Sequence, residues 1–299
     1  MTSFRHAVVG LDVMARGNVL TPGCQAALAH VRWLAGQGSL RCTLVHSDAP
    51  DESWDPESRG FEPNAPAQPD PLEAARADLE KAGIQTTLVV TEERAPFAIL
   101  RAVHDGPCDL VLVGKRTAID PDGPPVGSTA TKLLRKCPCA VWAVRPGATP
   151  PPTRILAASD LSEVGRKVLQ RSAEMAKASG AELHVVHAIQ LTMAAQLGRN
   201  GSEEEWIAER RGEVAKALRA ELAAFDTEAQ LHIGVTSPTR AVLECEAHLS
   251  PDLIVMGTVS RGGVPGLLLG NTAERLLNRL DTSLLALKPA DFVSPIKFD

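Results

Sequence analysis

An internal repeat constrains the fold of this chain more than any other feature of its sequence. Asp109–Pro146 and Asp252–Pro289 align without a gap and share Asp-Leu, three glycines, Thr-Ala, Leu-Leu and a final proline. Upstream, His6–Asp12 matches Arg154–Asp160, and both are short β-type runs that end in an aspartate. The chain is therefore two copies of one folding unit. Arg145–Thr153, "RPGATPPPT", joins them and is typical of a stiff, exposed linker.

The repeat predicts the domain limits and the fold class. We expect a first domain over residues 1–146, a second over 153–289 and a C-terminal tail over 290–299. Each copy alternates strand and helix patterns, and its strands are almost continuously apolar, which indicates a parallel sheet covered on both faces. The prediction is α/β, with two tandem Rossmann-like domains, each a five-stranded parallel sheet with helices on both faces. The first copy also carries a Pro- and Asp-rich insert, Ser47–Pro71, expected to be a surface loop.

Composition excludes several classes of protein. The net charge of −5 gives no basic field for nucleic acid or an anionic membrane. The first ten residues, "MTSFRHAVVG", do not form a signal peptide, and no apolar run approaches the ~20 residues that span a bilayer. The six cysteines are scattered rather than arranged as a disulfide framework. We therefore expect a reduced, soluble, cytoplasmic protein.

The glycine-rich stretch Gly257–Thr272 is the main candidate for a binding loop. It follows an apolar strand pattern and precedes a helix, and ligands of open α/β sheets bind at the carboxyl ends of strands. Backbone N–H groups at a helix N-terminus hold phosphate well, and Arg261 adds a positive charge. The stretch matches neither G-x-x-x-x-G-K-[ST] nor G-x-G-x-x-G. Spacing alone leaves a phosphate loop and a plain connection both open.

The order of these features resembles a known family. An aspartate ends the first strand, a glycine-led loop follows the fourth, and that loop closes with "GNTAE" before a final strand that ends in Lys-Pro. This resembles a universal stress protein domain in tandem, and "GTVSRGG…LLLGNTAE" with "KPADFVSPIKF" is most similar to the bacterial E-type tandem members. The resemblance implies two halves packed pseudo-symmetrically. It also implies ATP binding in members that keep G-x-x-G-x(9)-G-[ST].

Carried over to the second half, the resemblance implies a set of nucleotide-site residues. Those on the adenosine side are Ala158, Ser159, Asp160, Ala188 and Met256, and those on the phosphate side are Gly257, Ser260, Gly270, Asn271 and Thr272. The implied cofactor is ATP, with or without Mg²⁺. Two positions depart from the motif: Ser260 replaces a glycine, and Asn271 replaces a hydroxyl residue but can still donate a hydrogen bond.

The first half keeps the motif less well. Asp120 and Asp122 lie within its loop and would repel a triphosphate unless Lys115, Arg116 or a bound Mg²⁺ compensates. We expect this half to bind nucleotide poorly or to have another role. Its motif positions are Gly114, Thr117, Gly127 and Ser128.

Several other polar or reactive residues have both a functional and a simpler structural interpretation. Asp160 either binds ribose or adenine or caps the turn into the next helix, and the resemblance favours the ligand; for Asp12 we favour the cap. Cys245 and His248 share a helix face, but no second ligand pair stands near them, so we expect no metal site. The odd spacing of His184 and His187 points them to opposite faces of a strand.

"CPC", Cys137–Cys139, precedes a buried strand, and we expect small apolar core residues there rather than a redox site. No G-x-S-x-G or H-E-x-x-H motif occurs, so the chain is not predicted to be an enzyme, with slow ATP hydrolysis left open.

The leading hypothesis is a stress-response protein that binds ATP in its C-terminal domain and signals through partner proteins. Two alternatives stay open. One is a binding protein for an apolar, lipid-like ligand, because "VPGLLL", Val264–Leu269, lies within the loop. The other is an interaction scaffold without a ligand. The fifth strands are apolar enough to pair domain against domain as an intramolecular pseudo-dimer, and association of two chains is not decided.

Overall fold

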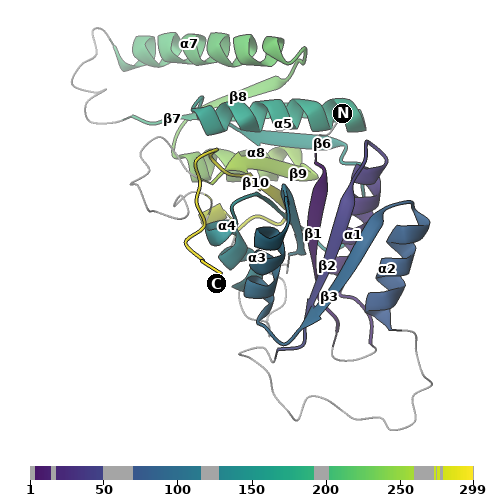
Figure 1. Cartoon of the computed structure of the whole chain (residues 1–299). Coiled ribbons are helices and arrows are strands. Elements are labelled where there is room, and N and C mark those ends of the chain that lie inside the picture. Colours follow the sequence, from purple (N-terminus) through teal and green to yellow (C-terminus); the bar gives the residue numbers. More distant parts are fainter. Residues whose placement is uncertain are drawn as a thin grey trace. The chain divides into compact units, whose positions relative to one another are not determined.

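The chain contains two compact units, one of Thr2–Pro151 with Val293–Asp299 and one of Pro152–Phe292. The computed structural model (Figure 1) describes residues 4–14, 18–49, 70–115, 128–191, 202–258, 273, 275–276 and 279–298.

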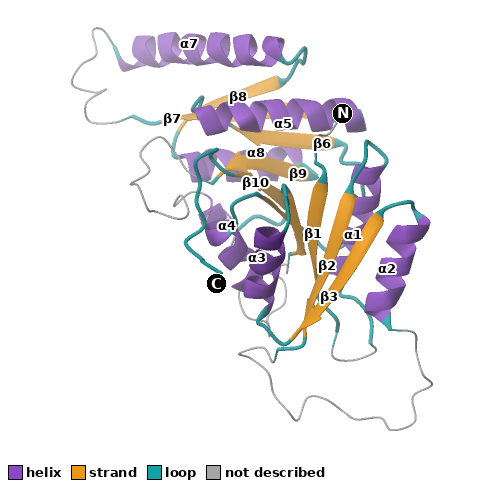
Figure 2. Ribbon diagram, viewed as in Figure 1, coloured by secondary structure: helices purple, strands orange, loops and turns teal. Residues whose placement is uncertain are grey.

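The first unit is built around a five-stranded parallel sheet. Its strands lie in the order β3-β2-β1-β4-β5, and every neighbouring pair is parallel. Helices connect the strands (Figure 2). In chain order the elements are β1 (His6–Leu11), α1 (Pro22–Ala35), β2 (Arg41–Ser47), α2 (Pro71–Lys81), β3 (Gln85–Thr91), α3 (Ala95–Asp105), β4 (Leu110–Gly114), α4 (Ser128–Lys136) and β5 (Ala140–Val144).

The second unit repeats this plan. Its strand order is β8-β7-β6-β9-β10, again parallel throughout. The predicted α/β class with two tandem five-stranded parallel sheets is therefore confirmed. The elements are β6 (Arg154–Ala158), α5 (Glu163–Ser179), β7 (Glu182–Ile189), α7 (Glu203–Ala224), β8 (Gln230–Val235), α8 (Pro238–Leu249), β9 (Leu253–Gly257) and β10 (Ser283–Leu287).

Local sequence explains where the helices of the second unit begin. The Ser162 hydroxyl accepts a hydrogen bond from Gly165 N and caps α5, as its position before the apolar pattern predicts. Ser202 and Glu205 form a reciprocal capping box at the start of α7. Pro238 occupies the first turn of α8, where its missing N–H costs nothing.

The central strands form the core because both of their faces are covered. β9 is buried except at Gly257, and β6 is buried at Ile155, Leu156 and Ala157. β8, at the edge of its sheet, is only half-buried along most of its length. The continuous apolar runs in the sequence thus correspond to strands covered on both faces.

The aspartate that begins each aligned segment links two strands by hydrogen bonds. Asp252 accepts hydrogen bonds from Thr153 N at 2.7 Å, Thr153 Oγ1 at 2.6 Å and Arg154 N at 2.9 Å. In the first unit, Asp109 accepts hydrogen bonds from the backbone N–H groups of Arg5 and His6. Each aspartate therefore joins the start of the fourth strand to the start of the first.

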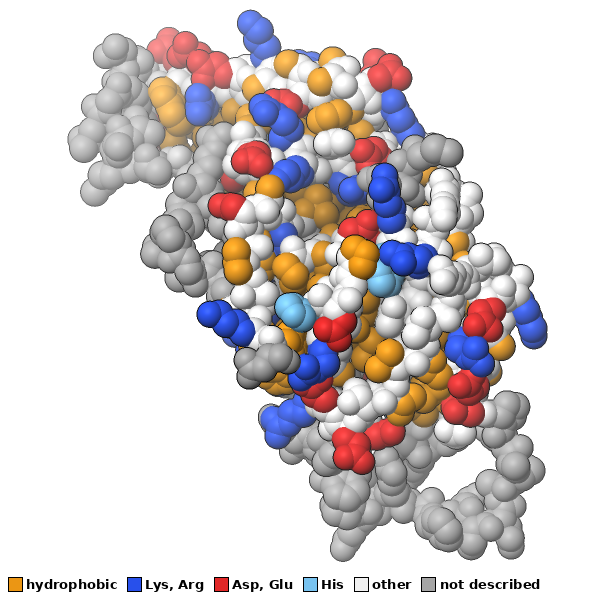
Figure 3. Space-filling view, in the orientation of Figure 1, with side chains coloured by type: hydrophobic (Ala, Val, Ile, Leu, Met, Phe, Trp, Pro, Cys, Tyr) orange, Lys and Arg blue, Asp and Glu red, His pale blue; other side chains and the backbone are white. Residues whose placement is uncertain are grey.

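The end of the chain packs with the first unit. The Arg101 guanidinium lies 4.7 Å from the centre of the Phe298 ring, and the His104 ring lies 5.5 Å from it. Both partners are on α3. On the face seen in Figure 3, acidic and basic side chains are interspersed rather than gathered by sign. In the part of the chain that the structure describes, no helix is long and apolar enough to cross a membrane.

Candidate functional site

A pocket with a cavity volume of about 110 Å³ lies in the second unit, at the carboxyl ends of β6 and β9. The strand order of this sheet reverses between these two strands, which is where open α/β sheets bind ligands. The pocket is lined by Ala158, Ser159, Asp160, Val164, Gly165, Val186, Ala188, Pro238, Ala241, Val242, Met256, Gly257, Thr258 and Ala273.

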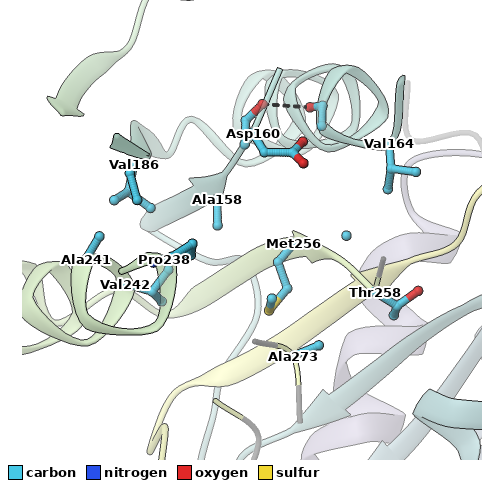
Figure 4. A pocket seen from close by; sticks show the side chains of 14 residues that line it. Ala158, Asp160, Val164, Val186, Pro238, Ala241, Val242, Met256, Thr258 and Ala273 are labelled. Atoms are coloured by element: carbon cyan, nitrogen blue, oxygen red, sulfur yellow. Dashed lines mark hydrogen bonds between the residues drawn. The ribbon is translucent and has the colours of Figure 1, made fainter. Parts of the chain in front are cut away.

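Asp160 has the capping role that the sequence left open for it, and its carboxylate also lines the pocket. Its Oδ1 accepts hydrogen bonds from Ser162 N at 3.0 Å and from the Ser162 hydroxyl at 2.5 Å, so this oxygen shapes the turn into α5. Among the described residues, no donor reaches Oδ2. The carboxylate lies on the α5 side of the pocket (Figure 4). One oxygen is therefore structural, and the other is free to accept a hydrogen bond from a ligand.

The strand end that carries Asp160 is held rigidly. The Ser159 hydroxyl donates to Gly165 O at 3.1 Å, and His187 Nδ1 lies 2.8 Å from Ser159 O. Gly165 allows this close approach, because a Cβ on it would lie 2.7 Å from Asp160 Oδ1 and 2.8 Å from Ser159 Oγ. Only glycine fits there without moving the carboxylate.

The two ends of the pocket differ in chemistry. Val186, Ala241 and Val242 gather at one end, and Met256 forms part of the floor (Figure 4). At the other end lie Val164 and Thr258, and Thr258 N donates to Leu287 O at 3.0 Å. The apolar end suits a flat aromatic ring. The Thr258 end lies where the chain enters the glycine-rich stretch.

Most of the predicted site residues that the structure describes lie around this one pocket. The lining contains Ala158, Ser159, Asp160, Ala188, Met256 and Gly257. Ser260, Gly270, Asn271 and Thr272 lie outside the described residues, as do Arg261 and Val264–Leu269.

The sequence did not predict that α5 and α8 contribute to the pocket. α5 contributes Val164 and Gly165, and α8 contributes Pro238, Ala241 and Val242. Val186, Thr258 and Ala273, from other segments, were not predicted either. The helical spacing of Val164, Val168 and Leu169 predicts that Val164 is on the buried face of a helix, but a periodicity marks which face is buried and not what it covers. Pro238 marked a helix start, but nothing local places that helix end at a pocket.

In the described part of the first unit, helices pack closely on the corresponding strand ends. A Cβ on Gly10, which corresponds to Ala158, would lie 2.8 Å from Ile99 Cδ1, so α3 packs directly on the end of β1. A Cβ on Gly114, which corresponds to Gly257, would lie 2.8 Å from Gly23 C, so the start of α1 packs backbone to backbone on the end of β4. The motif positions Thr117 and Gly127, and the side chain of Ser128, lie outside the described residues.

The other polar candidates do not gather into a site. His248 Nδ1 lies 2.7 Å from Glu244 O, and Cys245 on the same helix is half-buried. His184 Nδ1 lies 3.0 Å from His232 Nε2, away from the strand end that His187 contacts. Within the described ranges, no group of three or more His, Cys, Asp or Glu residues is arranged to hold a metal ion.

The cysteines of "CPC" differ from one another. Cys137 is fully buried, as predicted for a core residue, whereas Cys139 is only half-buried. Cys139 Sγ lies 3.4 Å from Cys137 Sγ and 3.8 Å from Cys108 Sγ. The expectation that both are small apolar core residues is therefore wrong for Cys139.

The repeat is also visible in comparison with known sequences. The model of the universal stress protein family matches residues 3–145 and again residues 152–288. The chain belongs to the universal stress protein family. It is 29% identical over 231 residues to universal stress protein E of Escherichia coli K12, with 73% of each chain covered. A universal stress protein E homolog of Haemophilus influenzae is 30% identical over 172 residues, covering 53% of this chain and 55% of that one.

Solved structures of similar fold cover almost the whole of this universal stress protein. A protein of Pseudomonas aeruginosa PAO1 described as functionally unknown has a TM-score of 0.70 at 24% identity, covering 97% of this chain and 94% of that one. A putative universal stress protein of P. aeruginosa UCBPP-PA14 has a TM-score of 0.68 at 22% identity, covering 97% and 95%. At these identities the likeness concerns the fold.

Proposed function

We propose that this universal stress protein binds ATP, together with Mg²⁺, in its second unit and acts in a stress response through ligand-dependent contacts with protein partners. The observation that carries this proposal is the pocket at the β6–β9 switch point, where the free oxygen of Asp160 lies beside an apolar end. We propose residues 1–146 and 153–289 as the two domains and 290–299 as the tail. The cytoplasm is the proposed location, because the six cysteines are scattered along the sequence rather than arranged as a disulfide framework.

The pocket has the features that adenosine requires. Val186, Val242 and Met256 offer an apolar surface for the adenine ring, and burying such a ring contributes through the area removed from water. Asp160 Oδ2 can accept a hydrogen bond from a ribose hydroxyl, and a charged acceptor makes such a bond stronger than a neutral one. The apolar surface therefore selects for a base, and the Asp160 carboxylate selects for a sugar.

The phosphates would be held by the stretch that begins at Gly257. The described part of this stretch ends at Thr258, at the opposite end of the pocket from Val186. Ser260, Gly270, Asn271 and Thr272 remain the proposed phosphate contacts, through backbone N–H groups and polar side chains at a helix start. Mg²⁺ would neutralise part of the phosphate charge.

We propose one nucleotide per chain. Ile99 fills the space above Gly10 in the first unit, whereas Ala158 and Val242 leave the corresponding space of the second unit open. We also propose that the chain binds its ligand rather than converting it. The polar side chains in the pocket lining are Ser159, Asp160 and Thr258, and both hydroxyls already bond to backbone carbonyl oxygens.

Calorimetric titration of ATP against matched variants of the two units tests this proposal. Asp160→Ala should weaken ATP binding roughly ten- to hundredfold, because it removes a hydrogen bond to a charged group worth about 1.5–3 kcal/mol. Ala158→Leu should also weaken binding, by filling the pocket without touching Asp160. Asp12→Ala, the same change at the corresponding position of the first unit, should leave the affinity unchanged.

The controls separate a lost contact from a lost fold. Asp160→Ala also removes the hydrogen bonds to Ser162, so far-UV circular dichroism must show that the helices persist. Equal affinity in the wild type, Asp160→Ala and Ala158→Leu would refute the site. Equal loss in Asp12→Ala and Asp160→Ala would refute its assignment to the second unit.

A small apolar ligand is the second candidate, because apolar side chains make up most of the pocket lining. Mass spectrometry of what denaturation releases from gently purified protein distinguishes the two. Recovery of ATP or ADP supports the nucleotide, and recovery of a lipid-like molecule supports the second candidate.

A further inference from the structure

Three thiols lie close together in the first unit, where β4 and β5 begin. Cys108 lies two residues before β4, and Cys137 and Cys139 precede β5. We propose that Cys108 and Cys139 form a redox-sensitive pair that closes to a disulfide when the chain meets a low-molecular-weight disulfide such as oxidised glutathione.

The backbone places the two sulfur atoms within reach of each other. β4 and β5 are parallel neighbours in the register Leu110↔Ala140, so both cysteines lie where the two strands begin. Continued towards the strand starts, this register places Cys139 opposite Asp109, so Cys108 and Cys139 are diagonal neighbours. The sulfur atoms are 3.8 Å apart, and a disulfide brings them to about 2.05 Å. Side-chain rotation supplies a movement of this size.

Exposure and geometry select this pair from the neighbouring thiols. Cys108 and Cys139 are both half-buried, so a small disulfide can reach them, whereas Cys137 is fully buried and Cys42 is 2% exposed. Cys137 Sγ is the nearer neighbour of Cys139, at 3.4 Å. A bond between them would close over Pro138 alone, whose fixed φ resists the twist of about 90° that a disulfide needs.

The reaction consists of two thiol–disulfide exchanges. The Cys139 thiolate attacks one sulfur of oxidised glutathione, forming a mixed disulfide and releasing one glutathione thiolate. The Cys108 thiolate then attacks Cys139 Sγ, forming the intramolecular bond and releasing the second glutathione. Two protein thiols are oxidised, one glutathione disulfide is reduced to two thiols, and the two protein protons pass to the glutathione leaving groups.

The surroundings of the two cysteines make disulfide formation slow and favour the intramolecular bond. Hydrogen bonds with Cys108 and Cys137, and then burial, raise the pKa of Cys139 well above its ordinary value. Little thiolate therefore exists near pH 7, and the rate of closure should rise with pH. Proximity of Cys108 favours intramolecular closure over a lasting mixed disulfide. The bond would tie together the two ends of the segment that contains α4.

The test uses the full chain, incubated in glutathione buffers of increasing oxidised fraction, quenched with an alkylating agent and mapped by mass spectrometry. Under oxidising conditions the alkylated cysteines should fall from six to four. After digestion with trypsin, the Cys108 peptide should appear cross-linked to the peptide "CPCAVWAVRPGATPPPTR", Cys137–Arg154. Cys137→Ala should keep this cross-link, and Cys139→Ser should abolish it.

Cys245→Ser is the matched control, because Cys245 is also half-buried but lies in the second unit; it should keep the cross-link. Six alkylated cysteines at every oxidised fraction would overturn the proposal. So would a bond between Cys137 and Cys139 alone, or a Cys108 cross-link that survives in Cys139→Ser.

Discussion

At the scale of single residues, Asp252 shows how one carboxylate can hold a sheet together. Burial alone would raise its pKa, but the hydrogen bonds from Thr153 and Arg154 and the Arg154 charge outweigh burial and lower it. The folded state thus binds the ionised carboxylate better than the unfolded chain does. Its contribution to stability is fully present above the unfolded pKa of about 3.9 and is lost as the pH falls through the lower folded pKa.

Asp252→Asn should therefore destabilise the second unit at neutral pH, by about 0.5–1 kcal/mol, since Thr153 and Arg154 lose a charged acceptor at a solvent-exposed site where water replaces part of the lost hydrogen bonds. The difference from the wild type should stay constant above about pH 5 and shrink in acid. Urea unfolding of both proteins at several pH values measures it. Asp291→Asn, at an exposed position, should show no such difference. A gap that widens as the pH falls would contradict this account.

At the scale of secondary-structure elements, the sequence predicted what depends on near neighbours. The Ser162 cap, the buried face of α5, and the spans of β7 and β8 follow from residues within a few positions of each other. The pattern after the glycine-rich stretch also predicts a helix over Thr272–Leu280, and this range lies mostly outside the described residues. How α1 packs on β4 was not predictable, because the two glycines that meet there are 91 positions apart.

Substitution of those glycines tests the packing of α1. Gly114→Ala should destabilise the first unit, by roughly 1–3 kcal/mol, because its Cβ would meet Gly23 backbone atoms at 2.8–3.1 Å. Gly38→Ala is the control, since no atom lies within 4 Å of a Cβ there, and it should be neutral or slightly stabilising. Thermal unfolding of the two variants compares them. Equal stability would mean that α1 does not approach β4 so closely.

At the scale of the whole molecule, the same strand order occurs twice, and the pocket described above lies in the second copy. Under the proposed function, ATP should stabilise the second unit alone. At a hundred times Kd the gain is about 2.7 kcal/mol, which corresponds to a rise in Tm of roughly 6–10 °C for that unit. Scanning calorimetry with and without ATP measures the shift. It should shrink by half or more in Asp160→Ala and persist in full in Asp12→Ala, and a shift of both units' transitions would contradict a single site.

The sequence by itself determined the repeat, the α/β class, the strand and helix spans and the position of Asp160 at a strand end. Period, capping and turn chemistry act over a few residues, so they can be read from the order of residues alone. Only the tertiary structure decided which copy has an open pocket and which thiols meet. Ile99 over Gly10 and Cys108 beside Cys139 are contacts between residues at least 31 positions apart, and Val242 and Ala158 line one pocket although 84 positions separate them. Such contacts depend on how helices and strands pack in three dimensions, and no local pattern encodes that packing.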